Sequence, residues 1–91
     1  LDLARILGWR AAHFRPALTA HGWRTAVSGD GAGFPDLLLV RHNRLVAAEL
    51  KAEKGRVTPE QEAWIDALRA AEVECHVWRP ADLEMIAEVL R

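Results

Sequence analysis

Three features that would tie the chain to a membrane or to an oxidising compartment are missing. No apolar run approaches the roughly 20 residues that span a bilayer. No signal peptide with a charged start and an apolar centre is present. Cys75 is the single cysteine, so an internal disulfide is excluded. We therefore expect no membrane partner and an intracellular location, such as the reducing cytoplasm of a bacterial or phage-infected cell.

The chain also lacks an excess of charge of either sign. Its net charge is −1, which by itself argues against a nucleic-acid partner. The charges are nevertheless segregated, because residues 1–56 carry nine Lys and Arg against five Asp and Glu (net +4), whereas residues 57–91 carry three against eight (net −5). A basic half can face phosphates while the acidic half faces solvent. Ordinary acidic helix surfaces explain the same pattern equally well.

The 91 residues are enough for one domain, which we take to cover 1–91. Hydrophobic content of 51% and charged content of 27% indicate a soluble globular protein with a modest core. The chain begins with Leu1 rather than Met, and we expect that the start of its first helix is missing.

Hydrophobic periodicity predicts an α/β domain in the order helix, three strands, helix, strand, helix. The clearest helix signal is a capping box, with Thr58 as the N-cap, Pro59 at the first position and Gln61 completing the box. That helix should run to about Glu72. The other expected elements are a helix over 1–7, strands over 9–14, 34–40, 45–50 and 73–78, and a closing helix over 80–90.

Two kinds of segment lie between the expected helices. Residues 18–33 hold four glycines and predict a long surface loop, which in a compact domain is usually functional or disordered. Residues 34–40 and 45–50 are nearly continuous apolar runs, which predict strands buried on both faces.

The polar stretch 41–44 predicts the hairpin turn between these two strands, because Asn tolerates the left-handed backbone of such turns. With His42 and Asn43 as the two turn residues, Asp36 falls directly opposite Glu49. Directly opposed residues share a face of the sheet, with Cβ atoms roughly 4.5–5.5 Å apart. Lys51, two residues beyond Glu49, points to the same face.

The facing carboxylates of Asp36 and Glu49 predict a site for a divalent cation. Two like charges opposite each other destabilise a sheet, and a carboxylate in an apolar strand is costly. A cation such as Mg²⁺ removes both conflicts and keeps several waters, one of which can become a nucleophile. The Lys51 ammonium can orient that water or stabilise charge growing on a phosphate.

A structural interpretation of these three residues is the alternative. Glu-x-Lys alone is expected by chance about once in a chain of this composition. Asp36 can simply end a turn, while Glu49 and Lys51 can be exposed edge residues. The scarcity of lysine weakly opposes this view, because the chain has ten arginines and two lysines, and only lysine can give up its proton.

Pro35-Asp36 followed by Glu49-Leu50-Lys51 resembles the signature of the PD-(D/E)XK restriction-endonuclease-like nucleases. The resemblance is closest to the VRR-NUC branch and covers about Gly8 to Leu90. It is carried by Gly33-Phe34-Pro35-Asp36-Leu37, Glu49-Leu50-Lys51, Gly55, Gln61 with Trp64, and Val77-Trp78-Arg79-Pro80 with Asp82.

This resemblance implies a restriction-endonuclease-like core with a mixed central sheet, Mg²⁺ or Mn²⁺ as cofactor without an organic one, and phosphodiester hydrolysis. It implies Asp36, Glu49, Lys51 and Gln61 as catalytic residues. The implied metal ligands are Asp36, Glu49 and the backbone carbonyl of Leu50. Branched DNA and a homodimer similar to Holliday-junction resolvases are the implied substrate and assembly. A nicking or end-processing nuclease, or a non-catalytic DNA-binding or assembly module with the same fold, is the alternative.

One feature departs from the family pattern. The family carries a further acidic residue on its first helix, and Asp2 lies too close to the first strand to be that residue. We expect that the missing start of the chain held it.

Other side chains are candidates for DNA contact or for the core. The DNA-contact candidates are Arg10, His13, Arg15, Arg24, Lys54 and Arg56. A histidine at a strand end is more often structural, and a solvated loop explains Lys54 and Arg56 nearly as well. Trp9, Trp64 and Trp78 are expected in the core, whereas Trp23 is expected to stack on a base or to pack at an interface.

Overall fold

The computed structural model describes residues 2–14, 17–19, 22–24 and 29–91, with only the backbone for 17–19 and 22–24. Its elements in chain order are α1 (Asp2–Ile6), β1 (Arg10–His13), β2 (Ala17–Thr19), β3 (Gly22–Arg24), β4 (Leu37–Arg41), β5 (Arg44–Leu50), α2 (Pro59–Ala70), β6 (Glu74–Trp78), a 3-10 turn (Pro80–Asp82) and α3 (Leu83–Leu90).

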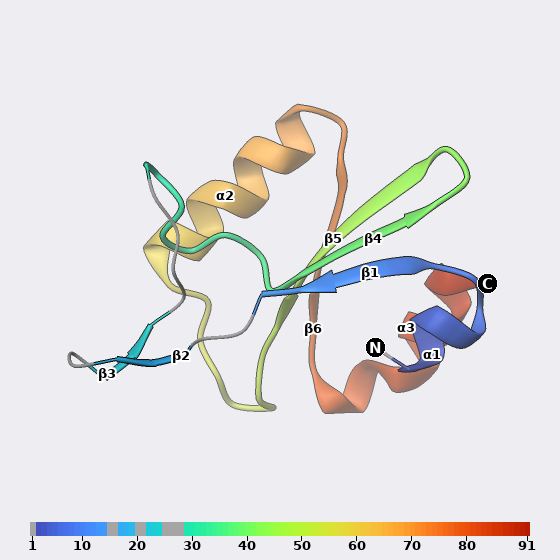
Figure 1. Cartoon of the computed structure of the whole chain (residues 1–91), viewed down its shortest axis with the longest axis horizontal. Coiled ribbons are helices and arrows are strands. Elements are labelled where there is room, and N and C mark those ends of the chain that lie inside the picture. Colours follow the sequence, from blue (N-terminus) through green and yellow to red (C-terminus); the bar gives the residue numbers. More distant parts are fainter. Residues whose placement is uncertain (1, 15–16, 20–21, 25–28) are drawn as a thin grey trace.

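A four-stranded mixed sheet organises the domain. Its strand order is β1-β4-β5-β6, in which β1, β4 and β5 are antiparallel and β6 runs parallel to β5. The connection from β5 to β6 passes through α2, as a parallel pair requires. α2 covers one face of the sheet, and α1 and α3 cover the other (Figure 1). The predicted α/β class and restriction-endonuclease-like core with a mixed sheet are confirmed.

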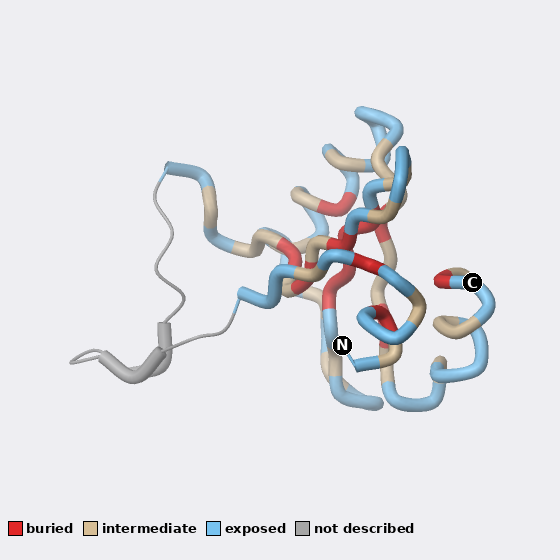
Figure 2. The backbone as a smooth tube through the Cα atoms, turned by 45° about the vertical axis from the view of Figure 1, so that its right-hand side comes forward, coloured by how far each residue is buried: buried red, intermediate tan, exposed pale blue. Residues whose placement is uncertain are grey.

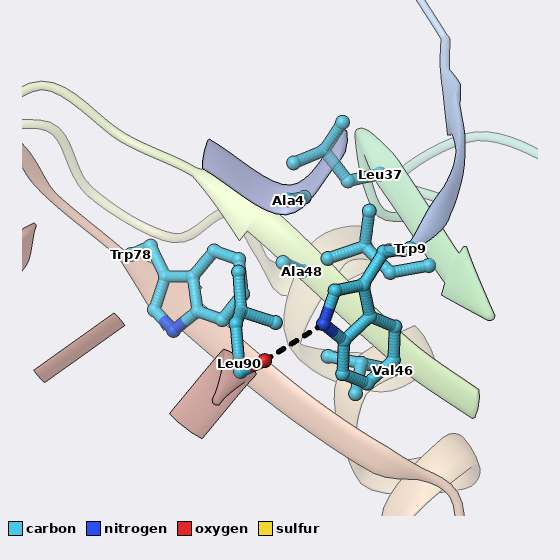
Figure 3. Close-up of a cluster of buried hydrophobic side chains, with 8 residues drawn as sticks. Ala4, Trp9, Leu37, Val46, Ala48, Trp78 and Leu90 are labelled. Carbon is cyan, nitrogen blue, oxygen red and sulfur yellow. Dashed lines mark hydrogen bonds between the residues drawn. The ribbon is translucent and has the colours of Figure 1, made fainter. Parts of the chain in front are cut away.

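The larger core lies between the sheet and the pair α1 and α3. Trp9 and Trp78 are buried there, as predicted, together with Leu39 and Leu90. The Trp9 Nε1 donates a hydrogen bond of 2.9 Å to the Leu90 carbonyl, which fixes the end of α3 to the start of β1 (Figure 3). Buried indole N–H groups usually have such a partner.

Two arginines of the basic half take part in this core. The Arg41 Nη1 donates to the carbonyls of Leu7 and Leu90, at 2.9 and 3.0 Å. Arg44 donates to the Val89 carbonyl and pairs with Glu74 at 2.8 Å. Cations are favourable at helix C-termini, where carbonyls lack helical partners. These two positive charges therefore hold the fold together, so part of the predicted basic surface has a structural use.

A smaller core joins α2 to the other face of the sheet. Ile65 packs there with Ala47 and Cys75, all three of them buried. Buried segments run along the middle of the sheet, while the rim is exposed (Figure 2). The face of β5 toward α2 also contains Glu49, only 1% exposed, and this buried carboxyl group is the unusual feature of the smaller core.

Three sequence predictions need correction. Residues 18–33 are not all loop, because β2 and β3 pair as an antiparallel ribbon. The closing helix over 80–90 is divided, since its first turn is 3-10 and α3 begins at Leu83. The strands are not buried on both faces along their whole length: Val40 and Leu45, next to the hairpin turn, are 43% and 42% exposed. α2, which covers this face of the sheet, ends at Ala70.

No helix among the described residues is both long enough and apolar enough to cross a bilayer.

Candidate active site

The predicted hairpin register is confirmed. Arg41 pairs with Arg44 and Leu37 pairs with Ala48, so the next pair outward is Asp36 and Glu49. The positive φ of the turn, 55°, falls on His42 and not on Asn43, the residue expected to take the left-handed backbone. A slip of one residue would turn every side chain of β5 to the opposite face, so the turn and the apolar pattern together decide where Glu49 points.

Asp36 and Glu49 form a carboxyl pair at the edge of the smaller core. Glu49 is 1% exposed and its carboxyl group is in hydrogen-bonding contact with Asp36. The Asp36 Oδ2 also accepts a hydrogen bond of 2.9 Å from the Leu50 amide, which orients it across the end of β5. Among the residues that the structure describes, none donates a hydrogen bond to the buried Glu49 Oε2. A buried oxygen without a donor is costly unless something else binds it.

The protonation of this pair reflects that cost. Burial raises the pKa of Glu49 to about 8, and the hydrogen bond and negative charge of Asp36 act in the same direction. The Lys51 ammonium and the Leu50 amide lower the pKa of Glu49, but by less. Near neutral pH the Glu49 carboxyl group is therefore expected to hold a proton that a cation must displace.

The residues of this pair fit a hard divalent cation. Carboxylate oxygens are the ligands that Mg²⁺ and Mn²⁺ prefer, and the unbonded Glu49 Oε2 is available as one of them. In the part of the chain that the structure describes, no group of three or more His, Cys, Asp or Glu side chains could hold a metal. With two carboxylates, the predicted Leu50 carbonyl and waters would complete the ligand set, as is usual for Mg²⁺.

The N-terminus of α2 lies directly against the chain that leads into Asp36. Gly33 has a φ of +83°, and a Cβ there would lie 2.5 Å from the Glu60 carbonyl carbon and 2.7 Å from the Gln61 amide nitrogen. Only glycine allows so close an approach of two backbones. The contact fixes Asp36, three residues later, relative to α2.

Gln61 performs the structural role predicted for it. Its backbone amide donates to the Thr58 Oγ1 at 3.2 Å, and its side-chain Oε1 accepts from the Thr58 backbone amide at 2.9 Å. The predicted capping box is confirmed. The contact of its backbone with the Gly33 segment brings it toward the strand of Asp36, and its role in catalysis stays a prediction.

Replacing Gly33 with Ala is expected to lower the free energy of unfolding by about 2–4 kcal/mol, because it adds a backbone clash to the strain of a positive φ. Gly29→Ala is the matched control, since Gly29 also has a positive φ, of 64°, but its Cβ would meet nothing within 4 Å. The control should lose only about 1 kcal/mol. Urea unfolding measures both, and equal losses would contradict the role assigned to the Gly33 contact.

The loop after β5 carries Lys51 and two further cations. Lys54 and Arg56 are exposed in it. The Arg79 Nη2 donates to the Gly55 carbonyl at 2.7 Å, and the Ala81 amide donates to the Glu53 side chain at 2.8 Å. These bonds hold the loop against the end of β6. The role of Arg79 was not predicted from the sequence, although its Val-Trp-Arg-Pro context was noted.

The other predicted DNA contacts are dispersed. Arg10 pairs with Val40, which lies four residues along β4 from Asp36. Arg10 is therefore at least about 13 Å from the carboxyl pair. His13 pairs with Leu37 and lines a small apolar cavity of about 150 Å³ on the face of α1 and α3, opposite the carboxyl pair. Arg15 and the side chain of Arg24 lie outside the described residues, and so does the side chain of Trp23.

An aromatic series beside Asp36 was not predicted. The Phe14 amide donates to the Asp36 carbonyl at 2.8 Å. Phe14 meets Phe34 edge to face, with ring centroids 5.6 Å apart, and Phe34 meets Trp64 in the same way at 5.0 Å. Trp64 is half-buried and its Nε1 donates to the Asp30 carbonyl at 2.8 Å. The prediction of Trp64 as a core residue is therefore wrong, since it anchors the 29–34 segment to α2.

A known protein family matches most of the chain. The sequence model of the VRR-NUC domain matches residues 5–82, a range that contains the carboxyl pair, Lys51, Gln61 and Phe14. Neither a curated protein nor a solved structure matches the chain.

Proposed function

Since the chain belongs to the VRR-NUC family of nuclease domains, we propose that it hydrolyses phosphodiester bonds of DNA with Mg²⁺ or Mn²⁺ as cofactor. The observation that carries the metal requirement is the buried oxygen without a donor on Glu49, the residue whose carboxyl group contacts Asp36 and is affected by the Lys51 charge. Glu49, with its pKa raised to about 8, can exchange its proton for a cation near neutral pH.

Each residue of the site has a proposed role that follows from its charge and position. Asp36 and Glu49, with the Leu50 carbonyl, would hold the cation. The bound cation would supply an activated water and neutralise charge on the phosphate. Lys51 orients the attacking water and stabilises the charge that develops on the phosphate oxygens. The Leu50 amide keeps the Asp36 carboxylate in place through its 2.9 Å hydrogen bond. Lys54 and Arg56, exposed on the adjoining loop, bind flanking phosphates and so position DNA without reading its sequence.

Cleavage of linear and branched DNA with and without Mg²⁺ or Mn²⁺ tests this function. The wild-type protein should cut only when the cation is present. Calorimetry should show Mn²⁺ binding that Asp36→Ala abolishes, because removal of one of two carboxylates leaves too few charged ligands. Asp66→Ala, which removes an exposed carboxylate from α2, is the control and should bind Mn²⁺ normally. Undiminished binding by Asp36→Ala would refute the metal site.

We propose further that the substrate is branched DNA and that the protein acts on it as a two-fold homodimer. One carboxyl pair can cut one strand at a time, and the domain is small, with a radius of gyration of 13.5 Å. Two matched cuts across a four-way junction therefore require two copies, and two-fold closure is the commonest assembly. α1 and the segment after Phe14 are the candidate contacts.

Sedimentation equilibrium at micromolar concentration tests the dimer. Two copies of the 10.2 kDa chain are expected to sediment together, either as free protein or bound to one four-way junction. One copy of the chain, both as free protein and per junction, would exclude the dimer and with it paired cutting. Nicking or end processing by a monomer would then be the remaining nuclease function, and metal-independent DNA binding without turnover would indicate an assembly module.

A further inference from the structure

We infer that Phe14 is the residue that selects unpaired DNA at this site, by stacking on a base next to the scissile phosphate. The inference rests on the proposed nuclease function and adds to it the chemical feature of DNA that the site binds. Three observations carry it: the place of Phe14 in the sheet, its exposure, and the support of its ring.

Phe14 lies next to the carboxyl pair in the order of the sheet. Its amide bonds the Asp36 carbonyl, and Asp36 in turn faces Glu49, so the three residues form one row across β1, β4 and β5. Opposed residues in antiparallel strands point to the same face. The contact of the Phe14 ring with Phe34, which packs on Trp64 of α2, confirms that the ring lies on the face of the carboxyl pair.

The Phe14 ring is both exposed and supported. It is 38% exposed, although Glu49, two strands away in the same row, is only 1% exposed. β1 is an edge strand of the sheet, so no further strand of the four covers Phe14 on its outer side. Phe34 and Trp64 stand behind it in successive edge-to-face contacts, and the Trp64 Nε1 is fixed to the Asp30 carbonyl. The ring therefore requires little ordering before it binds a flat partner.

A nucleotide base is the flat partner that this position selects. Phe14 lies one strand, roughly 5 Å, from Asp36, so a nucleotide that flanks a scissile phosphate at the carboxyl pair comes within reach of its ring. Bases stack on aromatic side chains without regard to sequence, because every base has a π-face. In a duplex those faces are covered and must be exposed at a cost, which is smallest for bases that are already unpaired. Phe14 thus favours junctions, flaps and other sites with unpaired bases over regular duplex.

The test compares cleavage of a flap or four-way junction with cleavage of linear duplex of the same sequence. Phe14→Leu keeps an apolar side chain against Phe34 but removes the π-face. It should lower kcat/KM for branched DNA on the order of tenfold, and lower kcat/KM for duplex much less. Phe14→Trp, which retains a stacking face, should keep the preference. Leu45→Ala is the matched control, because Leu45 is an apolar residue of similar exposure (42%) at the far end of β5.

A second arm separates stacking from a merely structural role. After the cut is mapped, each base flanking the scissile phosphate is removed to leave an abasic site. One of these removals should cost the wild-type protein as much as Phe14→Leu does, and should cost that variant nothing more. Additive losses, or a Phe14→Leu variant with wild-type preference, would overturn the inference while leaving the nuclease function intact. A wild-type protein that cuts no DNA with either cation would overturn both.

Discussion

The Glu49→Gln variant is expected to cut DNA about a thousandfold or more slowly than the wild type. Without metal, its melting temperature is expected to fall less between pH 5 and pH 9 than that of the wild type. Glutamine has nearly the same shape as glutamate, so the variant should fold. It cannot offer a carboxylate to the cation, however, and Asp36 alone should not hold Mg²⁺ or Mn²⁺. Loss of turnover should therefore accompany loss of Mn²⁺ binding, and a variant that keeps both would refute the metal role of Glu49.

The pH dependence of this variant follows from the raised pKa. Glu49 has a pKa of about 8 in the folded protein and an ordinary value of 4.5 when unfolded, so the folded state holds the proton more tightly between these values. The stability that this proton provides is fully present below pH 4.5 and is lost as pH rises through 8. Wild-type protein without metal should thus melt at a lower temperature at pH 9 than at pH 5. Glutamine does not titrate, so in Glu49→Gln this decline should be much smaller.

Thermal unfolding in chelator at several pH values measures the difference. Added Mn²⁺ at pH 8 should raise the melting temperature of the wild type and leave that of Glu49→Gln unchanged, because a ligand stabilises only a state that binds it. Glu62→Gln, which neutralises an exposed carboxylate on α2, is the control for loss of charge alone. The same pH profile in Glu49→Gln and in the wild type would show that Glu49 is not the group with the raised pKa.

The Lys51→Ala variant is expected to keep its fold and its Mn²⁺ binding but to lose about a hundred- to a thousandfold of turnover. Lys51 follows the last residue of β5 and is held there by its backbone, whose amide donates to the Trp78 carbonyl at 2.9 Å. That bond remains when the side chain is shortened. The ammonium acts electrostatically on Glu49, and its removal takes a positive charge away from the phosphate rather than a ligand from the cation.

Lys54→Ala is the matched control for Lys51→Ala, since Lys54 is the second lysine of the chain and lies on the same loop. Loss of a phosphate contact should raise KM and leave kcat nearly unchanged, whereas loss of a group that acts in the transition state should lower kcat. Single-turnover kinetics at saturating protein separate the two effects. Near wild-type kcat for Lys51→Ala would show that Lys51 is not catalytic.

Local signals in the sequence were enough for α2, for the strands of the main sheet and for the register of the central hairpin. The turn at His42 and Asn43 and the capping box of Thr58 and Gln61 depend on residues within four positions of each other, so their chemistry can be recognised without the rest of the chain. Because side chains alternate along a strand, the turn also determined that Asp36 faces Glu49.

Glycine content and hydrophobic periodicity gave wrong predictions where the structure of a segment depends on residues that the pattern does not include. The glycine-rich stretch 18–33 takes part in two short strands that pair with each other. Its glycine content predicts a loop, and strands of three residues are too short to show a hydrophobic pattern. Trp64 lies on the apolar side of α2, but its partners are Phe34 and the Asp30 carbonyl rather than the core. Periodicity identifies the face of a helix but not what covers that face.

The sequence by itself determined the strands of the main sheet and the facing carboxylates, because these rest on residues that are neighbours in the chain or across one tight turn. Only the tertiary structure decided that Glu49 is buried with an unbonded oxygen, since that burial needs α2 and β6 to pack on β5. It also decided that His13 lies on the opposite face from the carboxyl pair, whereas Phe14 lies on the same one. Charge and exposure at a site arise from segments far apart in sequence, and only packing brings those segments together.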